Sequence, residues 1–192
     1  MIERSLGIET GPRIVQWVRV RGRPLQARFW RASDQTLEPI VGEFARNSLG
    51  AERRESLIRV AGQPDIHLAE IRSYDPGELI FAETAQRIII GRDRFEEQAI
   101  PFGNKVMPEK RVIGGLDCRL VKFIDERGDL GDGELWWSED LQVTVLDNPT
   151  GREVTYRLFD IRQSEPPLGL FDLQGFRDLD SQGIFDPGLS PT

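Results

Sequence analysis

Residues 133–160 read GELWWSEDLQVTVLDNPTGREVTYRLFD and carry the clearest structural pattern in the chain. Apolar and polar side chains alternate in Leu141–Leu146 and again in Glu153–Ile161, and Asn148–Gly151 between them has the composition of a turn. Alternation with a period of two on both sides of a turn is typical of an antiparallel hairpin. The pattern predicts that the two segments pair and share one buried face. The residues expected on that face are Leu141, Val143, Val145, Val154, Tyr156 and Leu158.

Most of the remaining chain repeats this kind of pattern, with turn residues at intervals of roughly 8–12 residues. No window repeats apolar residues at helical spacing over three turns. The sequence therefore predicts a mainly β fold, a single curved antiparallel sheet forming an open half-barrel or a sandwich, with little helix. The other expected strands are Ile14–Val20, Leu25–Trp30, Glu38–Asn47, Ala51–Val60, Ile66–Ser73, Leu79–Ala82, Arg87–Ile90 and one that begins near Leu116.

Two segments do not fit a simple strand pattern. Gly91–Arg111 is polar with two prolines, which is compatible with a short helix plus a loop or with an interaction segment. The tail from Phe171 to Thr192 places seven large apolar residues among Asp, Gly and Pro, too many for a tail that is free in solvent. We therefore expect an antiparallel β domain over residues 1–170 and an extended tail over 171–192. The tail should pack on its own or a neighbouring chain, with Phe176 and Phe185 as anchors.

Composition excludes several classes of function. A formal net charge of −7 argues against general binding to nucleic acid or to an anionic membrane. Because Cys118 is the only cysteine, the chain can form neither an internal disulfide nor a metal site with several thiolate ligands. Because His67 is the only histidine, a metal site with several histidine ligands is excluded and a catalytic triad is disfavoured. We predict no catalytic residue, no cofactor and no metal site, and therefore no enzymatic activity.

Targeting signals are also missing from the sequence as it stands. There is no apolar run of 18 residues, so no transmembrane segment is expected. The start, MIERSLGIET, lacks a basic region followed by an apolar one, as a signal peptide would have. We expect a periplasmic or cell-envelope protein if a leader has been removed, and a cytoplasmic protein otherwise.

Two local features resemble binding sites, one for a metal ion and one for a partner. The loop Asp125–Glu134 concentrates carboxylates and glycines, which suits Ca²⁺, but it lacks the EF-hand spacing and is interpreted as an acidic hairpin loop. Trp136 and Trp137 should point to opposite faces of a strand, so that at least one indole is exposed and available to a partner. The residues predicted to bind a partner are Trp136, Trp137, Phe171, Phe176 and Phe185.

Three blocks of the sequence, Asn47–Ala85, Val112–Cys118 (VIGGLDC) and Glu134–Phe176, resemble a group of exported, β-rich bacterial proteins of acidobacterial type. The resemblance implies a fold similar to the LolA-like lipoprotein-carrier superfamily, a strongly curved antiparallel sheet with helices covering its open side. It also implies an extracytoplasmic origin. It transfers no catalytic residue to this chain.

Taken together, these features predict a non-enzymatic accessory or structural subunit of a bacterial envelope assembly, with a protein partner or homo-oligomer as its contact. The alternative is a periplasmic carrier or binding protein that holds a lipid or other apolar ligand in the concavity of the sheet. A hydrolase is disfavoured because histidine and cysteine are almost absent and no nucleophile motif is visible.

Overall fold

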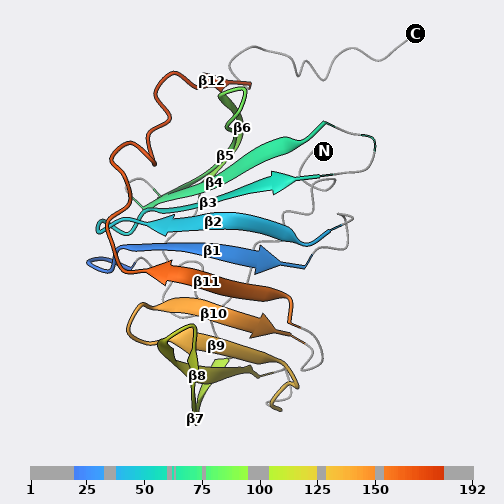
Figure 1. Ribbon diagram of the computed structural model, residues 1–192, viewed down its shortest axis with the longest axis vertical. Coiled ribbons are helices and arrows are strands. Elements are labelled where there is room, and N and C mark those ends of the chain that lie inside the picture. The colour runs from blue at the N-terminus through green and yellow to red at the C-terminus, as the bar shows by residue number, and fades with distance from the viewer. Residues whose placement is uncertain are drawn as a thin grey trace.

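The computed structural model describes residues 20–32, 38–59, 62, 64–74, 77–94, 104–124, 129–149 and 154–179. These residues contain strands and no helix, and the strands form one sheet (Figure 1). The strands are β1 (Leu25–Arg31), β2 (Ile40–Arg46), β3 (Glu52–Ile58), β4 (Ile66–Tyr74), β5 (Gly77–Glu83), β6 (Ile88–Arg94), β7 (Asn104–Ile113), β8 (Leu116–Phe123), β9 (Glu134–Ser138), β10 (Val143–Asn148), β11 (Tyr156–Arg162) and β12 (Arg177–Asp178).

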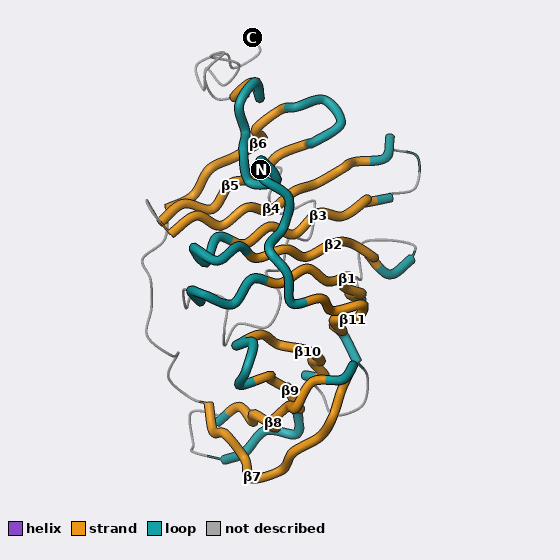
Figure 2. Tube along the Cα trace, turned by 60° about the vertical axis from the view of Figure 1, so that its left-hand side comes forward, coloured by secondary structure: helices purple, strands orange, loops and turns teal. Residues whose placement is uncertain are grey.

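The order across the sheet is β12-β6-β5-β4-β3-β2-β1-β11-β10-β9-β8-β7. Every neighbouring pair is antiparallel except β12, which runs parallel to β6. The sheet twists along its length and does not close into a barrel (Figures 1 and 2). The prediction of one open, mainly antiparallel sheet is therefore confirmed.

The predicted hairpin is present as β10 and β11, which pair antiparallel with Leu146 opposite Arg157. Val143, Val145, Tyr156 and Leu158 are buried as expected, whereas Val154 is only half-buried and precedes β11. Leu141 is buried too, but it precedes the strand because Gln142 has a positive φ of 49°. Because of this left-handed backbone, β10 begins at Val143, two residues later than the sequence pattern predicts.

The pairing of β1 with β11 joins two antiparallel meanders, β1 to β6 and β7 to β11. The ladder shifts register between Gln26 and Arg28, beside Asp160, whose φ is 51°. A bulge of this kind locally increases twist and bends the strand. The bend lies where the two meanders meet.

Part of the Gly91–Arg111 segment differs from the prediction. β6 continues to Arg94 and β7 begins at Asn104, so the helix expected as one alternative is wrong for these described residues. β7 is an edge strand with side chains exposed on both faces, which erases the alternation that marks a half-buried strand. Pro108 sits where the ladder with β8 shifts between Val106 and Lys110, so its missing N–H costs no regular ladder bond.

The two faces of the sheet differ in β1 to β5. The core face carries Phe29, Phe44 and Leu158, which belong to a large apolar cluster that continues into β8, β9 and β10. The outer face carries Arg28, Glu43 and Glu55 over β1 to β3, and apolar residues, mostly isoleucines, over β4 to β6. The expected strand Ile14–Val20 lies outside the described residues except for Val20.

Candidate functional site

A chain of ion pairs crosses the core face of β2, β3 and β4. Arg46 Nη1 lies 3.6 Å from Glu52, and Glu52 lies 4.0 Å from Arg72. Arg72 Nη2 is 2.5 Å from Glu70, which is in turn 3.6 Å from Arg54. Cross-strand register places these five residues side by side on one face, so their pairing follows from the sheet itself.

Burial changes the proton affinity of this network. Desolvation alone would raise the pKa of Glu70, but Arg72 and Arg54 outweigh it and the pKa of Glu70 is lowered. Desolvation would also lower the pKa of Arg54, yet the attraction of Glu70 raises it. Glu70 and Arg54 therefore stay charged and paired, which suits a structural role better than proton transfer.

Arg46 extends this network to a distant turn. Its side chain is fully buried and donates to the carbonyl oxygens of Leu141, Gln142 (3.2 Å) and Arg23 (3.1 Å). Leu141 and Gln142 form the turn between β9 and β10, so one guanidinium fixes that turn against the end of β2. Burial lowers the pKa of Arg46.

The outer face of β1 to β3 contains a hollow of about 200 Å³, which we call the outer pocket. Its floor includes Ala45, whose small side chain lies between Gln26 on β1 and Arg53 on β3. A second, shallower depression of about 400 Å³ adjoins it and shares Arg28, Glu43 and Glu55. The charged residues that line the outer pocket are Arg28, Arg53, Arg162, Glu43, Glu55 and Asp160.

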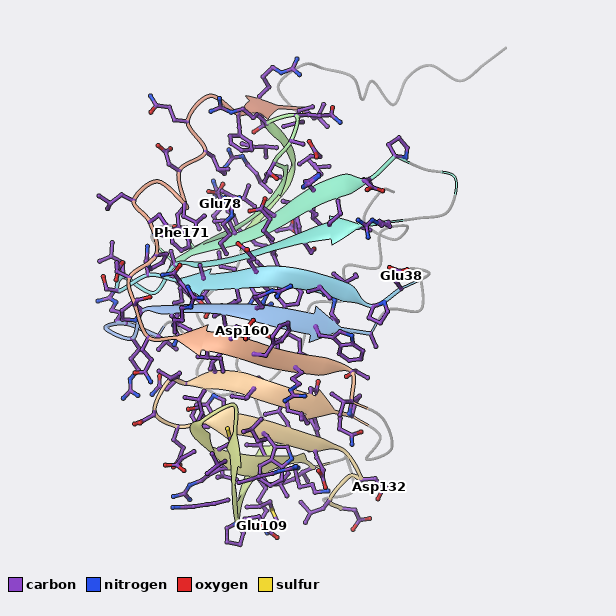
Figure 3. The ribbon with its side chains drawn as sticks, viewed as in Figure 1. Glu38, Glu78, Glu109, Asp132, Asp160 and Phe171 are labelled. Atoms are coloured by element: carbon purple, nitrogen blue, oxygen red, sulfur yellow. The ribbon has the colours of Figure 1, made fainter. Side chains whose placement is uncertain are left out.

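Some of these charges are already paired. Arg53 binds Glu55 at 2.5 Å, and Thr84 Oγ1 donates to the other oxygen of Glu55 at 2.8 Å. Arg28 lies 3.7 Å from Asp160, both groups being exposed, and its guanidinium lies over the ring of Phe159. Figure 3 shows Asp160 in the middle of the sheet.

Glu43 and Arg162 differ from their neighbours because, within the described part of the chain, neither forms a hydrogen bond or an ion pair. One wall of the outer pocket thus holds an unpaired carboxylate and another an unpaired guanidinium. No sequence motif marks this site. Its signal is weak, because alternate charged residues on a strand usually mark a solvated face.

A C-terminal strap, residues 163–179, crosses the ends of the strands from β11 toward β6 (Figure 2). Near β11, Gln26 Nε2 donates to Ser164 Oγ at 2.9 Å, and the N–H of Ser48 donates to the Glu165 carboxylate at 3.1 Å. Further along, Arg53 Nη1 donates to the carbonyl of Leu170 at 2.7 Å. Leu170 also lines the outer pocket, so the strap forms part of its wall.

The far end of the strap covers the outer face of β4 to β6. Phe171, Leu173 and Phe176 pack against Ala69, Ile71, Ile80 and Ile89 (Figure 3 labels Phe171). Arg87 stacks over the ring of Phe176 and donates to the carbonyl of Gln174 at 2.8 Å. The described part of the predicted tail thus lies on its own chain and gains backbone pairing through β12, whereas Phe185 lies outside the described residues.

The two tryptophans do point to different surroundings. Trp136 is 8% exposed and belongs to the main core cluster, with its Nε1 donating to Glu134 at 3.3 Å. Trp137 is half-buried beside Val121, Leu135 and Phe123. Trp136 therefore stabilises the core, and only Trp137 retains exposed indole surface.

Within the described ranges of the chain, Cys118 and His67 take no part in a reactive cluster. Burial raises the pKa of the Cys118 thiol to about 11, so it stays protonated at neutral pH. Among the described residues, no three His, Cys, Asp or Glu side chains converge as metal ligands would. Asp125 to Gly128, in the loop considered for Ca²⁺, lie outside the described residues.

β7 forms one edge of the sheet. Val106 and Val112 expose 51% and 66% of their surface. Lys105 lies opposite Lys122, so like charges face each other across this ladder, whereas Lys110 lies opposite Arg119, which is already paired with Glu139 at 2.7 Å. Like-charge pairs destabilise a sheet unless an anion compensates them.

Neither the protein-family models nor the curated protein sequences compared with this chain give a match. The part of the chain that the structure describes contains no helix that is long and apolar enough to cross a membrane.

Proposed function

We propose that the protein is a non-enzymatic accessory or structural subunit of a bacterial envelope assembly, and that it contacts an acidic protein partner along β7. The observation that carries the proposal is the open edge at β7, with two exposed valines and two exposed lysines, Lys105 and Lys110. A partner segment with Asp or Glu would pair with Lys105 and Lys110 and cover the exposed valines. The envelope location rests on the resemblance described above.

The shape of β7 limits how a partner can bind. Pro108 and the register shift interrupt the strand, and lysines on an edge discourage continuous strand addition between identical copies. The contact therefore combines short stretches of backbone pairing with side-chain contacts. This arrangement suits a specific heterologous partner better than an open-ended polymer.

The alternative function, a carrier for a lipid or other apolar ligand, draws support from the unclosed sheet. The five charged residues on the core face of β2 to β4 disfavour an acyl chain there, because an apolar ligand would leave them desolvated. Native mass spectrometry of the purified protein separates the two functions: a co-purifying lipid mass would support the carrier.

The test of the subunit proposal uses a photocrosslinking amino acid at Val112, with Leu168 as control because that residue is fully exposed on the strap. We expect one dominant protein adduct at position 112 and none of that mass at position 168. The identified partner is then purified and its affinity is measured for the wild type, for K105E/K110E, and for R94E on β6. The proposal predicts at least about tenfold weaker binding for K105E/K110E and little change for R94E.

The proposal would be overturned if positions 112 and 168 crosslinked equally, or if the purified partner bound K105E/K110E as tightly as the wild type. Circular dichroism of each variant shows whether the sheet is retained.

A further inference from the structure

We propose that the outer pocket binds a small zwitterion with the length of a dipeptide, by its free ammonium and free carboxylate. This inference is independent of the contact proposed at β7, because the outer pocket lies on the outer face of β1 to β3 and β11. It starts from Glu43 and Arg162, the two lining charges that have no partner among the described residues.

Register places these two charges in neighbouring rows of the sheet. Arg162 stands opposite Gln26, which stands opposite Ala45, and Arg53 completes this first row. Glu43 lies two residues from Ala45 on β2, in a second row between Arg28 and Glu55. Rows two residues apart on a strand are separated by about 6.8 Å.

The spacing selects the ligand. A ligand carboxylate fits the first row, where Arg162 is unpaired, and a ligand ammonium fits the second row, where Glu43 is unpaired. The backbones of Arg162 and Glu43 are about 6.8 Å apart along the strands and two strands, about 9.5 Å, apart across the sheet. An extended dipeptide spans about 7 Å between its ends, so it meets both charges where the two side chains lean toward each other, whereas a single amino acid is too short. Arg162 and Glu43 have long side chains that adjust to the remaining offset across the strands.

The fixed charges support this polarity. Arg53 is held in place by Glu55 and by the carbonyl of Leu170, so it adds positive potential to the first row without moving. Thr84 holds the other oxygen of Glu55 in the second row. Ala45 leaves the space for the ligand, and the strap closes one side through Leu170.

The test needs no variant in its first arm. Unblocked Ala-Ala is titrated into the ¹⁵N-labelled protein, beside N-acetyl-Ala-Ala, Ala-Ala-amide and free alanine. We expect shifts of amides in β1, β2 and β11 with a Kd in roughly the millimolar range or tighter for Ala-Ala, and at least about tenfold weaker binding for the other three. The proposal would be overturned if all four compounds bound equally well, or if Ala-Ala at roughly 10 mM shifted no amide resonances.

The second arm assigns the ends. Glu43→Gln should lower the affinity for Ala-Ala to that of N-acetyl-Ala-Ala, and Arg162→Gln should lower it to that of Ala-Ala-amide. Glu109→Gln and Arg94→Gln are matched controls on exposed residues elsewhere and should leave affinity unchanged. Ala45→Leu fills the floor of the outer pocket and keeps all its charges, and it should abolish the binding of Ala-Ala. If A45L bound Ala-Ala as tightly as the wild type, the ligand would not occupy this pocket. The amide spectrum of each variant reports its folding in the same experiment.

Discussion

Arg46 lies at the end of β2 with a side chain that is fully buried, and it satisfies three carbonyl groups and one carboxylate. No neighbouring side chain can replace its five N–H donors in the same geometry. Removal leaves the carbonyls of the β9–β10 turn without this donor, and it leaves Glu52 with Arg72, at 4.0 Å, as its remaining cation.

We therefore expect Arg46→Ala to lower the free energy of unfolding by on the order of 3–5 kcal/mol, the usual cost of breaking a buried ion pair. Denaturant unfolding measures this, with Arg94→Ala on the exposed end of β6 as control and an expected change of about 0.5 kcal/mol or less. A loss under about 1 kcal/mol in R46A would contradict the role given to this side chain.

Asp147 is a second buried charge, but it lacks a cation. Its Oδ1 has no hydrogen-bond partner among the described atoms, and burial raises its pKa from 3.8 to about 6. The folded state therefore holds the proton more tightly than the unfolded state does. Folding is then favoured at low pH, and stability falls as pH rises from about 4 through 6.

Asp147→Asn removes this titration. We expect the variant to gain stability over the wild type, and the gain to be larger at pH 7.5 than at pH 5 by roughly 1–1.5 kcal/mol. Unfolding curves of both proteins at several pH values test the slope. A gain that is constant with pH would show that Asp147 has an ordinary pKa in the folded protein.

Gly42 is required by the packing of β2 on its neighbours. A Cβ there would overlap the carbonyl oxygen of Glu55 and lie 2.5 Å from Phe29 Cζ, whereas a Cβ at Gly91 would meet nothing within 4 Å. We expect Gly42→Ala to cost about 1–3 kcal/mol or more and Gly91→Ala to be nearly neutral. Thermal denaturation of the two variants measures the difference, and equal melting temperatures would refute it.

At the scale of elements, the strap stabilises the β6 side of the sheet chiefly through Phe176 and its neighbours. Phe176→Ala should expose Ile80 and Ile89 and speed amide hydrogen exchange in β5 and β6, while β9 and β10 remain unchanged. Leu168→Ala removes an apolar side chain that is fully exposed in the same strap and should have no such effect. Uniform acceleration across the sheet in F176A would argue against local anchoring.

The strands that could be predicted from the sequence are those with one buried face. β10 and β11 alternate clearly because one side of each packs in the main cluster. β7 was missed because an edge strand exposes both faces, so Lys105 to Arg111 look like a loop in sequence. The fold class can therefore be predicted from the sequence, but the edge strand β7 cannot.

The candidate sites were less accessible, because they depend on register between strands. Glu52, Arg54, Glu70 and Arg72 look like solvated residues in sequence, and only the β3–β4 ladder brings them together in the interior. Glu43 and Arg162 are far apart in the chain, and they line the same pocket only because β1 pairs with both β2 and β11. No local pattern encodes that connection.

For the whole molecule, β11 is the link between the two meanders. A chain that ends at residue 149 lacks β11, β12 and the strap, so β1 and β10 each lose a neighbour. We expect this truncated chain to lack the native sheet, with poorly dispersed amide resonances and a non-cooperative thermal transition. A well-dispersed spectrum would mean that the meanders fold independently.

The β1–β11 ladder also has a consequence for how the protein is made. A ribosome releases β1 early, but its second neighbour is not synthesised until residues 156–162 have been added. Throughout that interval the nascent chain presents an unpaired strand with the alternating sequence LQARFWR, which is open to pairing with other chains. Slow translation therefore lengthens the exposure of this edge, and a holding chaperone that covers β1 would raise the yield of folded protein.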